Sequence, residues 1–539
     1  MADRLVLYGG KVCGPAGQAG SATALAAEFG RITYVGDDSG ALELPRGKGT
    51  ELLDLRGARV LPGLTDAHLH FRDLALGLRQ VDAELATPGA VAEAVARRAA
   101  EAGPGAWVIG YGWNRNAWDG AFPSKGALDA AAPANPVCLQ DKSGHAIWAN
   151  SAALAAAGIS AGRADPPDGK ILKDAAGEPT GILLEGAMAL MLSRLPAPSV
   201  EEIAAAMGDA IAKAQRFGLV GVHDLDGADS FAALQLLRSR GRLGLRVVKS
   251  VPLALLDQAI ALGLRSGLGD GRLAVGPVKM FADGAMGPRT AWMLEGYEGA
   301  PEDRGICVTP PEALREAVAK ANAAGLACAI HAIGDRANRE MLGIFAAARE
   351  STAAALRAGA AAPAAPNRIE HAQVLHPADI ARFAELGVVA SMQPIHATSE
   401  IGYTDRNLGA RSAGAYAFAS LLRSGAELAF GSDCPVETMD PLAGIHAAVT
   451  RRNAAGEPGP EGWRPGERLS VAEAVRAYSL GAARAAGLGR ERGGIEVGKL
   501  ADLTILDRDI YAIPPMEILE AKVAATVVGG SFAYRAGWL

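Results

Sequence analysis

Short apolar segments alternate with alanine-rich helical stretches through the middle of this chain, and this rhythm constrains the fold more than any other feature. The apolar segments are VLPGLTDAHLH, GLVGVHDLD, GLRVVKSV, LAVGPVKMFADG, LACAIHAIGD, NRIEHAQV, GVVASMQP and ELAFGSDCP. A strand–helix–strand repeat indicates parallel βαβ units, and eight strands close a barrel. We therefore expect a (β/α)₈ TIM barrel over residues 61–489. An open doubly wound sheet is the alternative that the rhythm leaves.

Strand-like segments divided by Gly-rich turns occupy both ends of the chain. Those at the N-terminal end indicate a small antiparallel sheet, and such segments return in ADLTILDRD and KVAATVVGGSFAYRAG. Because open sheet edges are avoided, we expect residues 1–60 and 490–539 to pair into one β-sandwich. Residues 72–198, between the first two barrel strands, carry helix and strand signals of their own. They predict an α/β subdomain inserted after the first barrel strand.

The composition limits the class of protein. Of 539 residues 50% are hydrophobic and 21% are charged, with a net charge of -6, which is typical of a soluble globular protein. There is no basic block to track nucleic acid, no apolar run long enough to span a membrane, and no secretory signal in MADRLVLYGG. Five scattered cysteines without a CxxC pair favour the cytoplasm. We expect a small-molecule substrate, and the sequence leaves open a homodimer.

Two histidines in the first barrel segment are candidates for metal binding. His68 and His70 are two residues apart in a strand, so their side chains share one face and can hold a metal at about 2.0–2.1 Å. A bare HxH is more often a pair of hydrogen-bonded structural histidines. However, His331, His371 and Asp433 also end barrel segments, at the rim that carries active sites in this architecture. Together these residues predict a metal cage of three to five ligands.

The order HxH, Lys, His, His, Asp resembles the amidohydrolase superfamily. VKMFADGAMGPRTAWM, AIHAIGDRAN, RIEHAQ and FGSDCPVETMDPLAGI are similar to its branch of N-substituted formamide deformylases, amidohydrolase family 3 or YtcJ-like. The resemblance covers nearly the whole chain, from ARVLPGLTDAHLH to GGIEVGKLADLTILD. It implies an enzyme that hydrolyses carbon–nitrogen bonds other than peptide bonds, with an amide or an N-substituted formamide as substrate.

The resemblance also implies the roles of individual residues. Asp433 is a ligand and the proton shuttle, and Lys279 matches a lysine that many relatives carbamylate with CO₂ to bridge two ions. An ordinary lysine beside a single ion is the alternative. One or two divalent ions, zinc first, would then activate a hydroxide for attack. The implied metal ligands are His68, His70, Lys279, His331, His371 and Asp433.

Residues outside the cage carry the expected substrate contacts. His145 resembles part of a DGHxxWxNS-like phrase of the branch and is assigned a catalytic and substrate-binding role, although Ser143 stands where that phrase has Asp. Trp113 lines an aromatic wall or belongs to the subdomain core. Arg289 grips the substrate, or forms an ion pair with Asp283.

Two further histidines follow barrel segments. His396, in the seventh loop, contacts the substrate or makes a loop hydrogen bond. His223 ends the second segment, and we expect it to be a rim residue and not a ligand.

Other functions remain open at this point. The same cage serves ring deaminases and ester, carbamate or lactone hydrolases. A deaminase is expected to add a Glu near the fifth-strand histidine, and IHAIGDRAN offers none, although Glu370 precedes His371. An inactive regulatory or binding homologue would have lost a ligand, whereas every expected position is filled.

Overall fold

The computed structural model of the protein describes residues 4–15, 17–45, 49–115, 118, 120–142, 145–167, 169–357 and 363–539, without the side chains of residues 351–357. The chain forms two compact units. The first combines Met1–Leu74 with Met207–Leu539, and the second is Ala75–Ala206. The chain passes between them within α2 (Phe71–Gly77) and α7 (Val200–Arg216).

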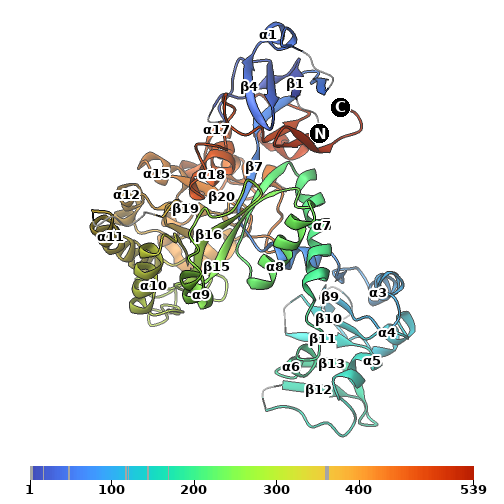
Figure 1. Ribbon diagram of the computed structural model, residues 1–539. Helices are drawn as coiled ribbons and strands as arrows, with labels where there is room; N and C mark the ends of the chain where they lie inside the picture. Colours follow the sequence, from blue (N-terminus) through green and yellow to red (C-terminus); the bar gives the residue numbers. More distant parts are fainter. Residues whose placement is uncertain are drawn as a thin grey trace. The chain divides into compact units, whose positions relative to one another are not determined.

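A sheet of eight parallel strands forms the centre of the first unit, and the prediction of a (β/α)₈ TIM barrel is confirmed (Figure 1). Each strand pairs in parallel with the next strand along the sheet. The strands are rich in buried apolar residues, as parallel strands covered on both faces require. They are β7 (Leu64–Leu69), β14 (Leu219–Asp224), β15 (Arg246–Pro252), β16 (Leu273–Phe281), β17 (Cys328–Ala332), β18 (Arg368–His371), β19 (Val389–Met392) and β20 (Leu428–Phe430).

Backbone hydrogen bonds just beyond the first and last strands close the barrel. The Asp433 amide donates to the His68 carbonyl at 2.7 Å, and the His70 amide donates to the Cys434 carbonyl at 2.8 Å. This pairing joins the chain after β20 to the end of β7. The closure therefore brings two predicted ligand segments together at the carboxyl rim.

Helices cover the outside of the barrel strands (Figure 1). α10 has Pro311 in its first turn, where a missing amide hydrogen costs nothing. α12 ends at Gly387 in the left-handed conformation, which glycine adopts without strain. These helices are α8 (Ala228–Ser239), α9 (Leu256–Ala261), α10 (Pro311–Ala323), α11 (Asp335–Arg357), α12 (Pro377–Leu386), α15 (Phe418–Arg423), α17 (Val471–Arg476) and α18 (Ala482–Ala485).

Strands from both ends of the chain share one sheet, in the order β2-β6-β21-β22-β23, and a second sheet has the order β4-β3-β1-β5. The prediction of an antiparallel N-terminal sheet is wrong at two places, because β1 pairs with β5 and β2 with β6 in parallel. Alternating burial does not distinguish the two pairings, and α1 (Asp38–Leu42) supplies a crossover between β4 and β5. The strands are β1 (Arg4–Tyr8), β2 (Lys11–Val12), β3 (Ala24–Glu28), β4 (Arg31–Gly36), β5 (Thr50–Asp54), β6 (Arg59–Pro62), β21 (Leu503–Leu506), β22 (Val523–Val528) and β23 (Ser531–Arg535).

The second unit is built on a sheet of order β12-β13-β11-β10-β9-β8. Asn150 caps its helix α5 by accepting a hydrogen bond from the Ala153 amide at 3.0 Å. Its strands are β8 (Val81–Asp82), β9 (Val108–Trp113), β10 (Val137–Asp141), β11 (Ala146–Ala149), β12 (Gly169–Lys173) and β13 (Pro179–Glu185). Its helices are α3 (Pro88–Ala102), α4 (Lys125–Ala131), α5 (Ser151–Ala156) and α6 (Met188–Leu192).

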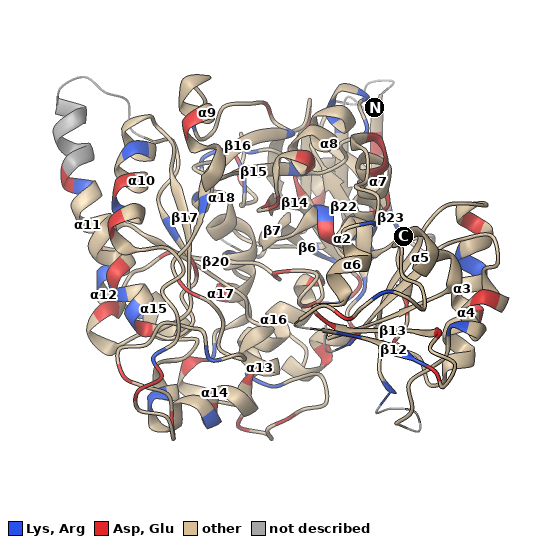
Figure 2. Cartoon of the chain, turned by 90° about the horizontal axis from the view of Figure 1, so that it is seen from below, with Lys and Arg blue, Asp and Glu red and all other residues tan. Residues whose placement is uncertain are grey.

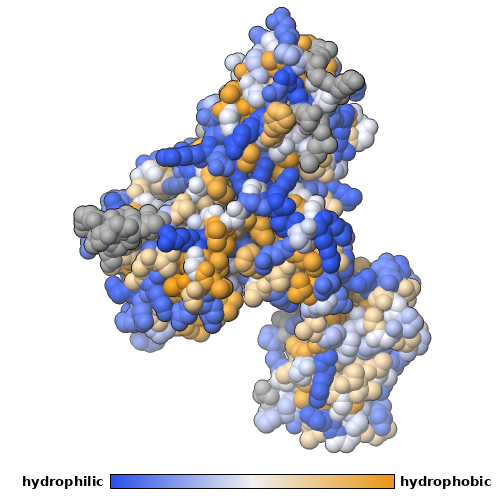
Figure 3. All heavy atoms as spheres, viewed as in Figure 1, coloured by the Kyte–Doolittle hydropathy of each residue, from blue (hydrophilic) through white to orange (hydrophobic). Residues whose placement is uncertain are grey.

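The surface is of mixed character. Acidic and basic residues alternate along α10, α11 and α12 (Figure 2), and hydrophilic and hydrophobic residues are interspersed over the visible face (Figure 3). Within the described residues, no helix is both long enough and apolar enough to cross a bilayer.

Candidate metal centre

The carboxyl rim of the barrel brings the predicted ligands together. The ring centres of His68 and His371 lie 4.9 Å apart, and those of His331 and His371 lie 4.5 Å apart. The ring centres of His68 and His70 are separated by 6.1 Å. His68, His331 and His371 come from three different strands, and His70 directly follows β7. The four rings therefore meet at the carboxyl rim, where the active sites of this architecture lie.

A carboxylate outside the centre holds each of the first two histidines. His68 donates from Nδ1 to Glu370 Oε2 at 2.5 Å, and His70 donates from Nδ1 to Asp226 Oδ1 at 2.8 Å. Because a ring nitrogen that donates a proton cannot bind a metal, Nε2 is the atom left for coordination in both residues.

The other two histidines are oriented by neutral acceptors. His371 donates from Nδ1 to Gln393 Oε1 at 2.8 Å, which leaves Nε2. His331 donates from Nε2 to the Gly284 carbonyl at 2.9 Å, which leaves Nδ1. Burial, followed by the charge of Lys279, lowers the pKa of His331 to about 3. Burial and His331 lower the pKa of His371 well below its usual value. Both rings are thus neutral, which is the form that coordinates metals.

Asp433 completes the arrangement. Its Oδ1 lies 3.3 Å from His68 Nε2 and 3.4 Å from His70 Nε2. Burial raises the pKa of this carboxyl, but His68, His70 and His371 together hold it well below its usual range. Asp433 is therefore ionised.

The donor atoms at this rim fit a divalent cation. Asp433 Oδ1 is buried and has no hydrogen-bond partner among the described residues, which is costly unless another group satisfies it. One donor atom from each of His68, His70 and Asp433 lies within 4.8 Å of the others. Imidazole nitrogens and a carboxylate are the ligands that zinc accepts.

The backbone at this rim is strained. His371 has a φ of 71° and Asp433 a φ of 59°, in the left-handed region that residues other than glycine seldom adopt. Such strain costs about 1–3 kcal/mol for each residue and persists where the surrounding structure imposes it. In both residues the strained backbone conformation occurs where the side chain points towards the candidate centre.

Lys279 comes from β16 and is 5% exposed. Burial lowers the pKa of its amine to about 8, although Glu370 and Asp433 act in the opposite direction. Its Nζ lies 4.8 Å from the centre of the Phe281 ring. At neutral pH a larger fraction of Lys279 is therefore in the neutral amine form than for an ordinary lysine. The neutral amine is the form that reacts with CO₂.

Comparison with known proteins identifies the family. The sequence model of the amidohydrolase family matches residues 51–534. The chain belongs to the amidohydrolase family. The resemblance to its YtcJ-like branch is confirmed by two relatives.

These relatives match over nearly their whole length. The chain is 35% identical to the protein LONG AFTER FAR-RED 3 of Arabidopsis thaliana, covering 95% of this chain and 88% of the relative. It is 34% identical to the putative amidohydrolase YtcJ of Bacillus subtilis, covering 90% and 91%, and 30% identical to the N-substituted formamide deformylase of Arthrobacter pascens, covering 95% of each.

Solved structures agree with this placement. An uncharacterized metal-dependent hydrolase of Pyrococcus horikoshii aligns with a TM-score of 0.78 and 28% identity. The alignment covers 95% of this chain and 99% of the archaeal chain.

Two predicted substrate contacts lie near the rim. His396 begins the short helix α13 (His396–Ser399), is 5% exposed, and its ring is stacked 6.3 Å from that of His371. Its Nε2 is buried without a hydrogen-bond partner among the described residues. A ligand could therefore satisfy this atom.

Arg289 does not form the expected ion pair. Its Nε donates to Asn407 Oδ1 at 3.0 Å, on α14 (Ile401–Leu408). Asp283 instead accepts backbone hydrogen bonds, including one from the Trp292 amide at 2.8 Å. The prediction of an Asp283–Arg289 pair is wrong. Backbone amides of the loops after β16 and β17 donate to the Asp283 carboxylate in place of Arg289.

The remaining predicted contacts belong to the second unit. Trp113 is 1% exposed and donates from its indole nitrogen to the Leu139 carbonyl at 2.9 Å. Its burial favours the alternative of a core residue, although it borders a cavity of the unit together with His145. His145 is exposed and contacts Glu185 at 3.0 Å. Ser143 lies outside the described residues.

His223 is not a rim residue. It is buried, and its Nδ1 accepts a hydrogen bond from Arg368 Nη1 at 2.9 Å across the barrel. The prediction of a rim position is wrong because His223 points into the barrel interior from β14, and so lies below the end of the strand. It is not among the grouped metal donors of the described residues.

The partners that orient the histidines could not be recognised from the sequence. Glu370, Asp226 and Gln393 each follow or precede a strand end, and nothing in their spacing connects them to a particular histidine. Glu370 did stand out as the residue before His371. Its engagement with His68 depends on the curvature of the closed barrel.

Proposed function

We propose that this protein is a metal-dependent hydrolase that cleaves an amide or N-substituted formamide-like C–N bond. The observation that carries the proposal is the buried Asp433 Oδ1, which faces Nε2 of His68 and of His70 while the Nδ1 atoms of both rings are held by other carboxylates. The name of the Arthrobacter relative, an N-substituted formamide deformylase, supports the bond type. The similarity to the archaeal metal-dependent hydrolase supports the requirement for metal.

The residues divide naturally between two ions. His68, His70 and Asp433 would hold one divalent ion, and His331 and His371 would hold a second, with a carbamylated Lys279 between them. Carbamylation adds the Lys279 amine to CO₂ with loss of one proton and gives an anionic ligand in place of a cation. A bound divalent ion, zinc first, would supply a Lewis acid that polarises the carbonyl and acidifies the attacking water.

The protein's own groups move the proton and hold the substrate. Asp433 takes the proton from the attacking water and returns it to the leaving nitrogen, which must be protonated to depart. His396 would donate from Nε2 to the substrate, a role supported by the absence of any other partner for this atom among the described residues. Arg289 and the exposed His145 are further proposed contacts.

Metal content tests the centre. Purified protein should contain about one to two divalent ions per chain, and removal by a chelator should abolish hydrolysis until metal is returned. Replacing His68 and His70 together by Ala should remove metal and activity but leave a folded chain, because barrel stability resides mainly in packing away from this rim. Elemental analysis without metal, together with chelator-insensitive turnover, contradicts the proposal.

A substrate panel tests the bond. Metal-replete protein should release product from N-substituted formamides or acyl amides with a higher kcat/KM than from carbamates, aryl esters or lactones. Ammonia release from amino-substituted rings as the best reaction would make the protein a deaminase. Glu370 gives no support to that reading, because its carboxylate is buried between Arg368 and His68.

The Lys279→Ala protein should lose one of two ions and most of its activity. The physical reason is that alanine supplies no bridging oxygens. A short carboxylate added with excess metal should partly restore turnover by replacing them. Metal analysis and kinetics with and without added propionate measure both effects, and unchanged metal content would exclude the bridging role of Lys279.

A further inference from the structure

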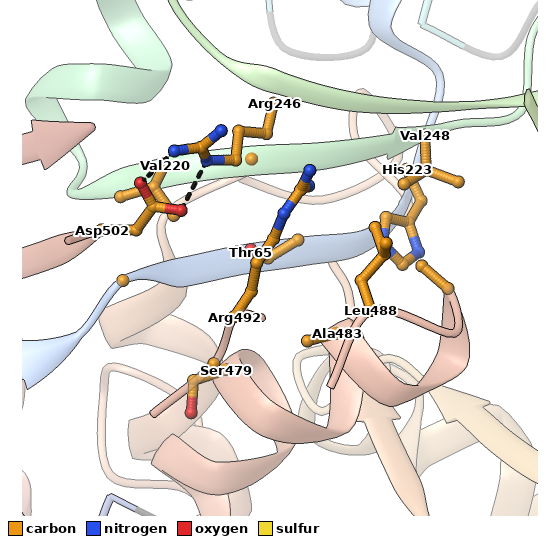
Figure 4. Close-up of a pocket in the computed structure, with 14 residues that line it drawn as sticks. Thr65, Val220, His223, Arg246, Val248, Ser479, Ala483, Leu488, Arg492 and Asp502 are labelled. Carbon is orange, nitrogen blue, oxygen red and sulfur yellow. Dashed lines mark hydrogen bonds and ion pairs between the residues drawn. The ribbon is translucent and has the colours of Figure 1, made fainter. Parts of the chain in front are cut away.

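A small cavity lies at the amino end of the barrel, opposite the metal centre. It is lined by residues of β7, β14 and β15, among them Thr65, His223 and Arg246, and by residues between Ser479 and Gly493 (Figure 4). About 20 Å³ is open to the centre of a water-sized sphere. That space is enough for one water molecule or one ion of similar size.

One cation at this cavity makes no ion pair among the described residues. In Figure 4 the Arg492 side chain extends past Thr65, between the Arg246–Asp502 pair and His223. Its Nη2 donates to the Gly271 carbonyl at 3.2 Å, whereas its Nε is buried with no partner. Among the described residues, no carboxylate oxygen lies within the 4.0 Å of an ion pair with Arg492. Burial and Arg246 lower its pKa to about 10, so the group stays charged at neutral pH.

The acidic residue on the cavity wall is already engaged. Asp502 accepts from Arg246 Nε at 2.5 Å and from Arg246 Nη2 at 2.7 Å. It also accepts from the Gly529 amide at 2.8 Å. Its charge is thus matched mainly by Arg246, and the half-buried Arg492 is left without an ion pair, although Asp502 and Glu491 favour its charged form from a distance.

The other polar groups on the cavity wall are donors. Arg368 can only donate to His223 Nδ1, so His223 carries its proton on Nε2. Burial, with Arg368, lowers the pKa of His223 well below its usual value, and the ring is neutral. Within the described part of the chain, the Thr65 hydroxyl has no hydrogen-bond partner. The wall therefore offers an anion a guanidinium, an imidazole and a hydroxyl.

We propose that this cavity binds a single monovalent anion of the size of chloride. The ion would neutralise Arg492 and accept hydrogen bonds from Thr65 and His223. The space suits one small ion, and the surplus of donors disfavours a metal cation. The expected effect of the ion is on stability, because it would balance the charge of Arg492.

Thermal unfolding in different sodium salts tests the proposal. At constant ionic strength, replacing gluconate by chloride or bromide should raise the Tm by about 1–3 °C for each tenfold increase above the dissociation constant. Arg492→Gln should abolish the difference between halide and gluconate. Arg490→Gln, at an exposed arginine two residues away, should retain it. Equal Tm values in halide and gluconate for the native chain would overturn the proposal.

Crystals of the native chain grown in bromide provide a measurement that does not depend on a variant. An anomalous peak between Arg492, Thr65 and His223 is expected. Density for water alone, without an anomalous signal, would overturn the proposal. This measurement also decides the matter if Arg492→Gln does not fold.

Discussion

The Asp433→Asn protein should keep its fold and lose about 10²–10⁴-fold in kcat, the usual cost of removing a general base. Asparagine has nearly the same shape and retains one oxygen, so the hydrogen bond from the residue 433 amide to the His68 carbonyl is unaffected. It cannot accept a proton from the attacking water. Metal binding should weaken as well, because an uncharged oxygen replaces the carboxylate that lies 3.3 Å from His68 Nε2.

Steady-state kinetics at saturating metal, with metal analysis of the same samples, separate these two effects. Asp257→Asn is the matched control, since that carboxylate is exposed on α9 and pairs only with Lys320 among the described residues. Its kcat should equal that of the native protein. Near-native turnover in Asp433→Asn would show that another group carries the proton, and His396, with its unpartnered Nε2, is then the residue to replace.

The sequence was sufficient to predict which candidate ligands meet at the rim because the fold imposes a simple rule. Residues that end parallel barrel strands meet at one rim, so His68, His331, His371 and Asp433 could be placed together from strand ends alone. Their meeting at the rim did not depend on side-chain angles. The strand-to-helix rhythm that predicted the barrel predicted this rim as well.

Contacts across the barrel could not be predicted in the same way. Glu370 reaches His68 from β18, and His223 meets Arg368 from β14, and both contacts depend on the radius and stagger of the closed sheet. Asp283 likewise is satisfied by amides of loops whose course the sequence does not specify. The parallel pairing of β1 with β5 was missed because alternation of burial is the same in either direction.

Glu370→Gln should reduce both metal affinity and stability. Glu370 is fully buried, accepts from His68 Nδ1 at 2.5 Å and lies 2.5 Å from Arg368 Nε. Glutamine can still accept from His68 but carries no charge to raise the basicity of its free nitrogen. Loss of such a partner typically costs 10–100-fold in metal affinity. The buried Arg368 loses its counter-charge, which costs about 3–5 kcal/mol when one member of a buried pair is removed.

Competition of each protein with a chromogenic chelator measures the affinity, and chemical unfolding of the metal-free proteins measures the stability. Glu385→Gln, at an exposed position on α12, should change neither quantity. The two effects of Glu370→Gln have different causes and can be separated, because the loss of stability must persist without metal. A variant with weakened metal binding but native stability would mean that Arg368 finds another counter-charge. Unchanged metal affinity would instead show that His68 keeps its orientation without the Glu370 charge, since the packing of β7 against its neighbours would then suffice to hold the ring.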